Sequence, residues 1–101
     1  MAKLIALYKH PENREAFDEH YFNVHGPLTE KIPGLQEMKV TKMTGSPMGG
    51  EGKYYLMCEM FYDDMDALQT GLRSSEGRAS GKDLMGFAGD LVTLMIGEDV
   101  K

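Results

Sequence analysis

The chain lacks several features that would place it in a particular class of protein. Its single cysteine, Cys58, cannot form a disulfide within the chain. No apolar run approaches the ~20 residues that cross a bilayer, and the opening MAKLIALYKH lacks the apolar segment of a signal peptide. Lys and Arg do not cluster, and the net charge is −5. We therefore expect a cytoplasmic location and neither nucleic acid nor membrane as a partner.

The composition is that of a folded domain. Apolar residues make up 42% of the 101 residues, with four Phe and five Tyr. This content favours one domain over residues 1–101 and excludes a disordered chain. The nine methionines indicate irregular core packing or an adaptable apolar pocket.

The first helix is predicted from its two ends and its apolar spacing. Asn13 is a good N-cap, because its side-chain oxygen can accept from the free amides of the first turn. Gly26-Pro27 predicts the end of the helix, since proline cannot continue the hydrogen-bond ladder. Between these ends one face carries Phe17, Tyr21, Val24 and Leu28.

The remaining patterns predict four strands and two further helices. The predicted strands are residues 3–9, 35–43, 54–62 and 90–97, and the glycine-rich segment 45–52 is a mobile loop. One helix begins at Asp63 or Asp64, and a short one begins within residues 74–77. This order favours an α+β ferredoxin-like βαββαβ sandwich with an antiparallel sheet.

Both faces of the predicted sheet carry apolar side chains, although the helices can cover only one. Residues 54–62 place Tyr54, Leu56, Cys58 and Met60 on one face and Tyr55, Met57 and Phe61 on the other. An uncovered apolar face favours association. We therefore predict a homodimer that packs sheet face to sheet face.

His25 is the candidate for acid–base chemistry. It follows Tyr21 by one helical turn, so the two side chains can reach a common space. A helix C-terminus favours the imidazolium form, and a histidine beside a phenol can transfer protons. The spacing alone, however, favours a structural role in which His25 only bonds the carbonyls of the last turn.

Other candidate motifs predict no cofactor site. His20 and His25 are five residues apart, which is ~500° on an α-helix, so His20 would lie off the His25 face. His10 is the third imidazole, and no pattern of Cys or carboxylates completes a metal-ligand set. Cys58 is predicted to be buried and inert. The segment GSPMGGEG lacks the Gly-Lys-Ser/Thr of a phosphate loop.

Two segments, AFDEHYFNVHGPLTEKIPGL and SSEGRASGKDLMGFAGDLVTLM, resemble the EthD family of the dimeric α/β-barrel superfamily. The resemblance covers nearly the whole chain. It is carried by Phe17, Tyr21, His25, Pro27, Leu28, Pro33 and Gly34, and then by Ser74, Glu76, Gly77, Asp83 and Phe87. It implies a ferredoxin-like protomer that pairs with a second copy as a barrel, and a pocket near His25 between sheet and helices.

The resemblance also implies a class of chemistry. The family is named after a protein encoded with an oxidative ether-degradation system and is often placed among oxidoreductases. Relatives include lactone isomerases, polyketide cyclases and decarboxylases, and monooxygenases that need neither metal nor flavin. We therefore expect a cofactor-free protein that acts on a hydrophobic aromatic, lactone or polyketide-type molecule.

In that interpretation His25 is the general acid/base and Tyr21 its partner or a hydrogen-bond donor to the substrate. Tyr8, Phe17, Leu28 and Phe87 are expected to bind the substrate. The alternative is a non-catalytic module that binds a hydrophobic ligand or assists an oxygenase system. A third possibility is a surface for a different protein chain, without a pocket.

Overall fold

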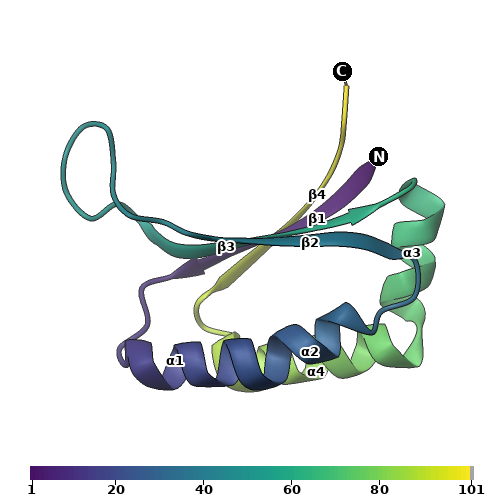
Figure 1. Cartoon of the computed structure of the whole chain (residues 1–101), viewed down its shortest axis with the longest axis horizontal. Helices are drawn as coiled ribbons and strands as arrows, with labels where there is room; N and C mark the ends of the chain where they lie inside the picture. Colours follow the sequence, from purple (N-terminus) through teal and green to yellow (C-terminus); the bar gives the residue numbers. More distant parts are fainter. Residues whose placement is uncertain (101) are drawn as a thin grey trace.

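Four antiparallel strands form one sheet, with the helices against one of its faces (Figure 1). The computed structural model describes residues 1–100. The strand order is β2–β3–β1–β4. The elements are β1 (Ala2–Lys9), α1 (Arg14–His20), η1 (Tyr21–His25, a π-helix), α2 (Gly26–Glu30), β2 (Leu35–Lys42), β3 (Tyr54–Tyr62), α3 (Met65–Arg73), α4 (Ser75–Ala88) and β4 (Val92–Glu98). The predicted ferredoxin-like α+β fold is confirmed.

Local capping explains where the helices begin. The side chains of Asn13, Asp64 and Ser74 each accept a hydrogen bond from the amide three residues ahead, at the starts of α1, α3 and α4. Gly34 has a φ of +86°, which favours glycine, and it leads the chain into β2. The helix α4 has 14 residues and is therefore not the short helix that the sequence predicted.

The helical segment that begins at Arg14 does not end at Gly26-Pro27, and that prediction is wrong. It continues through η1 into α2, and Gly26 keeps right-handed helical angles (φ −55°, ψ −53°). The amide of Gly26 bonds to the carbonyl of Tyr21, five residues back. Proline disrupts a regular α-helix because its ring meets the carbonyl four residues earlier. The wider π-turn instead places Pro27 in the first turn of α2, where its missing amide costs little.

The π-helix also changes which residues face the sheet. Its extra residue moves the buried face from Val24 and Leu28, which the sequence predicted, to His25 and Thr29. Val24 is 43% exposed, whereas His25 and Thr29 are 6% and 3% exposed. Leu28 is only half-buried. A histidine and a threonine thus point into the interior at positions where the helical pattern predicted aliphatic side chains.

Strand register determines the face that packs against the helices. In β1 and β3 this face carries Ala2, Leu4, Ala6, Tyr8, Leu56, Cys58, Met60 and Tyr62. Tyr55 was predicted on the opposite face, and this is wrong. The pairing shifts between Tyr8 and Lys9, so Tyr55 and Leu56 are both buried. The hydroxyl of Tyr55 donates to Asp18 of α1 at 2.8 Å.

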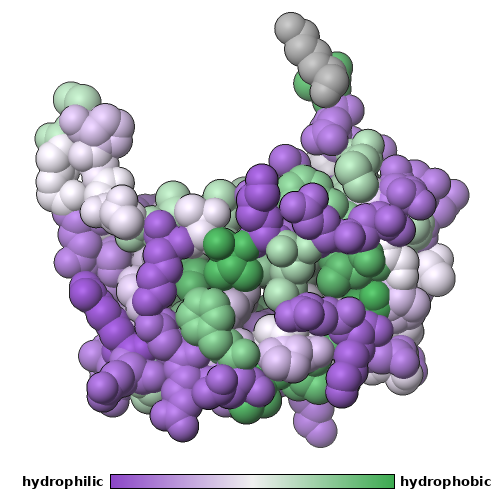
Figure 2. Space-filling view, viewed as in Figure 1, coloured by the Kyte–Doolittle hydropathy of each residue, from purple (hydrophilic) through white to green (hydrophobic). Residues whose placement is uncertain are grey.

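Aromatic side chains form the core beneath α1 and η1. The rings of Tyr8, Phe17 and Tyr21 lie 5.4–5.9 Å apart in edge-to-face and stacked pairs. Figure 2 shows apolar side chains gathered between the sheet and the helix layer, with hydrophilic side chains on the outer side of the helices. The apolar interior of the molecule therefore lies between these two layers.

The second sheet face has no covering element among residues 1–100. We call it the open face, and its residues in β1, β3 and β4 are Lys3, Ile5, Leu7, Met57, Glu59, Phe61, Thr93 and Met95. The β2–β3 loop and the end of β4 both extend on this side (Figure 1). In the described part of the chain, no helix is long and apolar enough to cross a membrane.

Two glycines of α4 provide a test of the packing. A Cβ on Gly77 would lie 2.7 Å from the carbonyl oxygen of Leu72, whereas a Cβ on Gly86 would meet nothing within 4 Å. We expect Gly77→Ala to lower the free energy of unfolding by about 3 kcal/mol through overpacking. Gly86→Ala should raise it by about 0.5–1 kcal/mol, because alanine is the better helix former. Urea unfolding of both variants measures the difference, and equal stabilities would contradict this packing.

Candidate active site

A cavity of about 410 Å³ lies between the sheet and the helices. Its walls come from β1, β3 and β4 on one side and from η1, α2, α3 and α4 on the other. This volume is in the range of small-molecule sites. The cavity lining includes no Asp, Glu, Lys or Arg within residues 1–100. Such a space fits a largely apolar, uncharged molecule.

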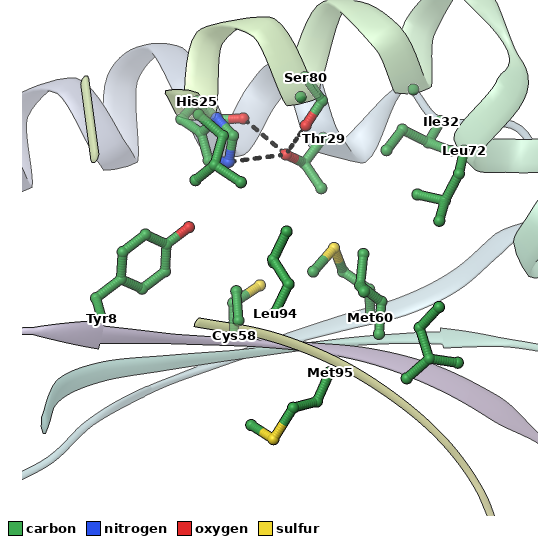
Figure 3. A pocket seen from close by; sticks show the side chains of 16 residues that line it. Tyr8, His25, Thr29, Ile32, Cys58, Met60, Leu72, Ser80, Leu94 and Met95 are labelled. Atoms are coloured by element: carbon green, nitrogen blue, oxygen red, sulfur yellow. Dashed lines mark hydrogen bonds between the residues drawn. The ribbon is translucent and has the colours of Figure 1, made fainter. Parts of the chain in front are cut away.

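The polar groups of the cavity are concentrated at one end (Figure 3). His25, Thr29 and Ser80 lie together in the helix layer, and the hydroxyl of Tyr8 points toward this layer from the sheet. The other end is formed by aliphatic side chains, including Ile32 and Leu72. Cys58, Met60 and Leu94 project into the space from the sheet. A bound molecule would therefore place one polar group near His25 and its apolar part toward Ile32.

His25 is held by a carboxylate behind it. Its Nδ1 lies 3.0 Å from Oδ2 of Asp83, which comes from α4. A carboxylate only accepts hydrogen bonds, so Nδ1 carries the proton and donates. The neutral ring then has its lone pair on Nε2, the nitrogen nearer Thr29. The Asp83 contact thus fixes both the tautomer and the orientation of the ring.

The neighbouring hydroxyls leave this lone pair available. Thr29 donates its hydroxyl proton to the carbonyl of His25 at 3.1 Å. Its Oγ1 is therefore an acceptor for the hydroxyl of Ser80, at 2.8 Å. With its proton committed to the carbonyl, Thr29 cannot also donate to Nε2 of His25, which lies 3.5 Å away. The arrangement can therefore accept a proton from a molecule in the cavity.

Burial lowers the pKa of His25 below its usual value of 6.5, and Asp83 opposes this effect. The sequence predicted a bias toward imidazolium from the end of a helix. That prediction is wrong, because the helix continues past His25 and the ring is buried. The lowered pKa favours the neutral imidazole at pH 7.

This lowered pKa predicts a loss of stability in acid. The unfolded chain binds a proton at His25 near pH 6.5, whereas the folded chain binds it only at lower pH. The free energy of unfolding should therefore fall as the pH decreases below about 6.5. Thermal unfolding between pH 7.5 and 5 should show a larger loss of Tm in the wild type than in His25→Gln. Parallel pH profiles would contradict the lowered pKa.

His20 shares the same carboxylate, contrary to the prediction that it lies away from the His25 face. Its Nε2 is 2.9 Å from Oδ1 and 3.0 Å from Oδ2 of Asp83. In η1 the hydrogen bonds span five residues, so residues five apart lie closer in angle than on an α-helix. One carboxylate of α4 therefore contacts both histidines of the first helical segment.

The other residues that the sequence proposed occupy different positions. Tyr8 lines the cavity with His25. Tyr21, Phe17, Leu28 and Phe87 are not among its lining residues. The ring of Tyr21 lies 5.7 Å from that of His25, and burial raises the pKa of its phenol. Phe87 packs on His20 at 4.4 Å between ring centroids. Tyr21 and Phe87 thus support the histidines from behind the cavity wall.

The structure adds Asp83, Thr29 and Ser80 to the residues around His25. Asp83 was part of the family resemblance without an assigned role, and no sequence signal linked it to His25, 58 residues away. Thr29 follows His25 by four residues, a spacing that could have paired them on one helix face. Within residues 1–100 no group of three His, Cys, Asp or Glu side chains could hold a metal ion. Cys58 is buried as predicted, and burial raises the pKa of its thiol.

Comparison with known proteins identifies close relatives. A family model described as the EthD domain matches residues 9–90. The crystal structure of an EthD-family protein from Bacillus halodurans is 67% identical, with 99% of each chain covered and a TM-score of 0.96. An uncharacterized 11.0-kDa protein of Rhodococcus erythropolis, from the thcB–thcC intergenic region, is 26% identical over 98% of this chain and 95% of its own.

More distant structures share the fold. A dimeric ferredoxin-like protein of unknown function from Jannaschia sp. is 17% identical, with 98% of this chain and 100% of that chain covered and a TM-score of 0.68. SnoaB, a cofactor-independent oxygenase from Streptomyces nogalater, is 11% identical, with 99% and 92% covered and a TM-score of 0.66. The family match extends over most of the residues that build both the sheet and the cavity. The chain belongs to the EthD family.

Proposed function

We propose that the protein is an enzyme that removes a proton from a largely apolar small molecule and returns it elsewhere, with His25 as the general base. The observation that carries the proposal is the free Nε2 of a neutral, buried imidazole at the polar end of an apolar cavity. Asp83 supports it by holding the tautomer that a base requires. A lactone, an aromatic compound or a polyketide fits this description.

The hydroxyls at the same end support a role in binding the reacting group. Ser80 and Tyr8 line the cavity on opposite sides of the polar end. Burial raises the pKa of Tyr8, so its phenol stays protonated and can donate a hydrogen bond. A carbonyl oxygen of the ligand that accepts this bond would become more negative as the adjacent carbon loses its proton. Tyr8 is therefore the proposed donor to the developing oxyanion.

The experiment is to identify the molecule that stays with the purified protein and then follow its chemistry. Mass spectrometry of an organic extract gives the ligand, which is returned to fresh protein in D₂O. Deuterium incorporation or isomerisation that depends on His25 supports proton transfer. A ligand that is recovered unchanged, without deuterium, would contradict the proposal.

The second candidate function is a non-catalytic module that holds the same class of ligand. The observation in its favour is that most of the cavity wall is apolar, so binding alone could account for its shape. Ligand that binds tightly and undergoes no reaction in the presence of the protein would favour this role. Rapid conversion of the ligand would exclude it.

An oxidative variant of the proposal follows from SnoaB, which is described as a cofactor-independent oxygenase. A ligand deprotonated by His25 would be an electron-rich carbanion, with which dioxygen can react. Oxygen consumption with the recovered ligand, measured with an oxygen electrode, separates this reaction from isomerisation.

The single cysteine, Cys58, fits the cytoplasmic location that we propose.

We also propose that the protein is a homodimer formed through the open face. In a single chain this face leaves Ile5 and Leu7 only half-buried and Met95 exposed, and the Jannaschia protein with this fold is described as dimeric. Ile5 pairs with Glu59 and Met95 near the middle of the sheet. Light scattering should therefore give twice the mass of one chain at micromolar concentration.

Ile5→Asp should convert the dimer to a monomer, because it places an unpaired carboxylate beside Glu59 in the middle of this contact. Val24→Asp is the matched control, since Val24 is exposed on the helix side. The control should keep the dimer mass. A wild type that scatters as one chain, or a dimer that persists in folded Ile5→Asp, would contradict this interface.

A further inference from the structure

Asp83 joins two histidines that face different environments. Its Oδ2 lies 3.0 Å from Nδ1 of His25 and also 3.0 Å from Nε2 of His20. The exposed fraction of the side chains rises from 7% in His25 to 20% in Asp83 and 33% in His20. The three groups thus form a continuous hydrogen-bonded chain that leads from the interior to the surface.

The two ends of this chain open into different spaces. His25 lines the cavity between sheet and helices, whereas His20 and Asp83 line a separate groove on the outer side of the helix layer, together with Lys82 and Phe87. A molecule that fills the cavity would exclude water from Nε2 of His25. A proton exchanged between His25 and solvent would then need a route that does not pass through the cavity.

We propose that Asp83 and His20 form this route, a proton path between His25 and the outer surface. The inference rests on the proposed function, because a base whose cavity is filled by its ligand needs another route for proton exchange with solvent. His20 is a positioning and relay residue, since it contacts Asp83 and does not line the cavity.

The path moves protons only, and no group is oxidised or reduced. His25 takes a proton from the ligand at Nε2 and releases the proton on Nδ1 to Oδ2 of Asp83. In the structure Nε2 of His20 donates to Asp83, so the free lone pair of His20 is on Nδ1. A turn of the ring brings Nδ1 to Asp83, where it accepts this proton, and Nε2 then releases its own proton to water. When Nε2 of His25 returns its proton to the ligand, the reverse passage through Asp83 restores the starting tautomer.

The groups around His20 can support this transfer. The titratable side chains that share its surface grooves are Asp83 and Lys82 of α4 and Glu12 of the β1–α1 connection. The ring of Phe87 covers one side of the imidazole, at 4.4 Å between centroids. The same contacts could also serve only to hold α1 against α4. The test must therefore separate proton movement from structural support.

His20→Gln makes this separation, because a glutamine amide can still donate to Asp83 but cannot carry a proton. Nuclear magnetic resonance of ¹⁵N-labelled histidine measures the exchange of the His25 Nδ1 proton with water. We expect this exchange to slow at least tenfold in the variant, while the Tm changes little. An exchange rate within twofold of the wild type, in a folded variant, would overturn the proposal.

His10→Gln is the matched control. His10 contacts the β2–β3 loop through the carbonyl of Gly52 and does not reach Asp83, so the exchange at His25 should be unchanged. If His20→Gln fails to fold, the wild type supplies the second measurement. Filling the cavity with a neutral apolar probe should leave the exchange of the His25 Nδ1 proton with water within twofold, and a tenfold slowing would overturn the path. These readouts need no substrate, so failure of the path and failure of the proposed enzyme activity remain distinguishable.

Discussion

His25→Gln is expected to slow proton transfer from a molecule bound in the cavity by about 10²–10⁴-fold, the usual contribution of a general base. Glutamine can keep a hydrogen bond to Asp83, but its side chain offers no nitrogen lone pair that accepts a proton. The cavity itself loses little volume, so ligand affinity should change much less than the rate. The measurement is deuterium incorporation into the recovered ligand in D₂O, followed by mass spectrometry.

The effect should be specific to this histidine. His10→Gln removes an imidazole at the far end of β1 and should leave the rate within about twofold of the wild type. Equal rates in the wild type and in folded His25→Gln, with ligand still bound, would show that His25 is not the general base. The binding role would then be the better account of the cavity.

Filling the cavity is expected to weaken binding of an apolar probe at least tenfold, which corresponds to about 1.4 kcal/mol. Gly81 of α4 lines the cavity, and a Cβ at this position would meet nothing within 4 Å. Gly81→Leu can therefore extend a side chain into the space without overlap at the backbone. Titration with the fluorescent probe N-phenyl-1-naphthylamine, which is neutral and apolar, measures the loss of affinity.

Gly86→Leu is the matched control for this substitution. Gly86 belongs to the same helix and has equally free space at its Cβ, but it lines the outer grooves and not the cavity. The same change of residue should leave probe affinity within about twofold of the wild type. Equal losses in both variants, or no loss in Gly81→Leu, would show that the probe does not bind in this cavity.

Much of the fold could be predicted because its signals are local. The strand over residues 54–62 and the cap Asn13 depend on neighbouring residues and are found as predicted. Of the two predicted starts Asp63 and Asp64, the structure has Asp64, and α4 begins within residues 74–77 as predicted. The open face was also predicted from the apolar alternation of the strands. Tyr55 was misplaced because the pairing shift beside it depends on the partner strand β1, which the alternation within β3 does not reveal.

The site was less accessible to prediction because it depends on one unusual turn and one distant residue. Gly26-Pro27 normally predicts a helix end, and only the π-helix allows the chain to continue and to bury His25 and Thr29. Asp83 arrives from α4, and its contact with His25 needs the packing of two helices. The sequence could thus propose His25, but not its neutral state or the carboxylate that orients it.

The protonation state of His25 is the most direct test of this mechanism. Long-range ¹H–¹⁵N correlation spectra of the wild-type protein at pH 7 distinguish the two neutral tautomers from the imidazolium ion. The structure predicts a neutral ring with its proton on Nδ1, bonded to Asp83, and a free lone pair on Nε2. An imidazolium, or a neutral ring with its proton on Nε2, would contradict His25 as the base of this site.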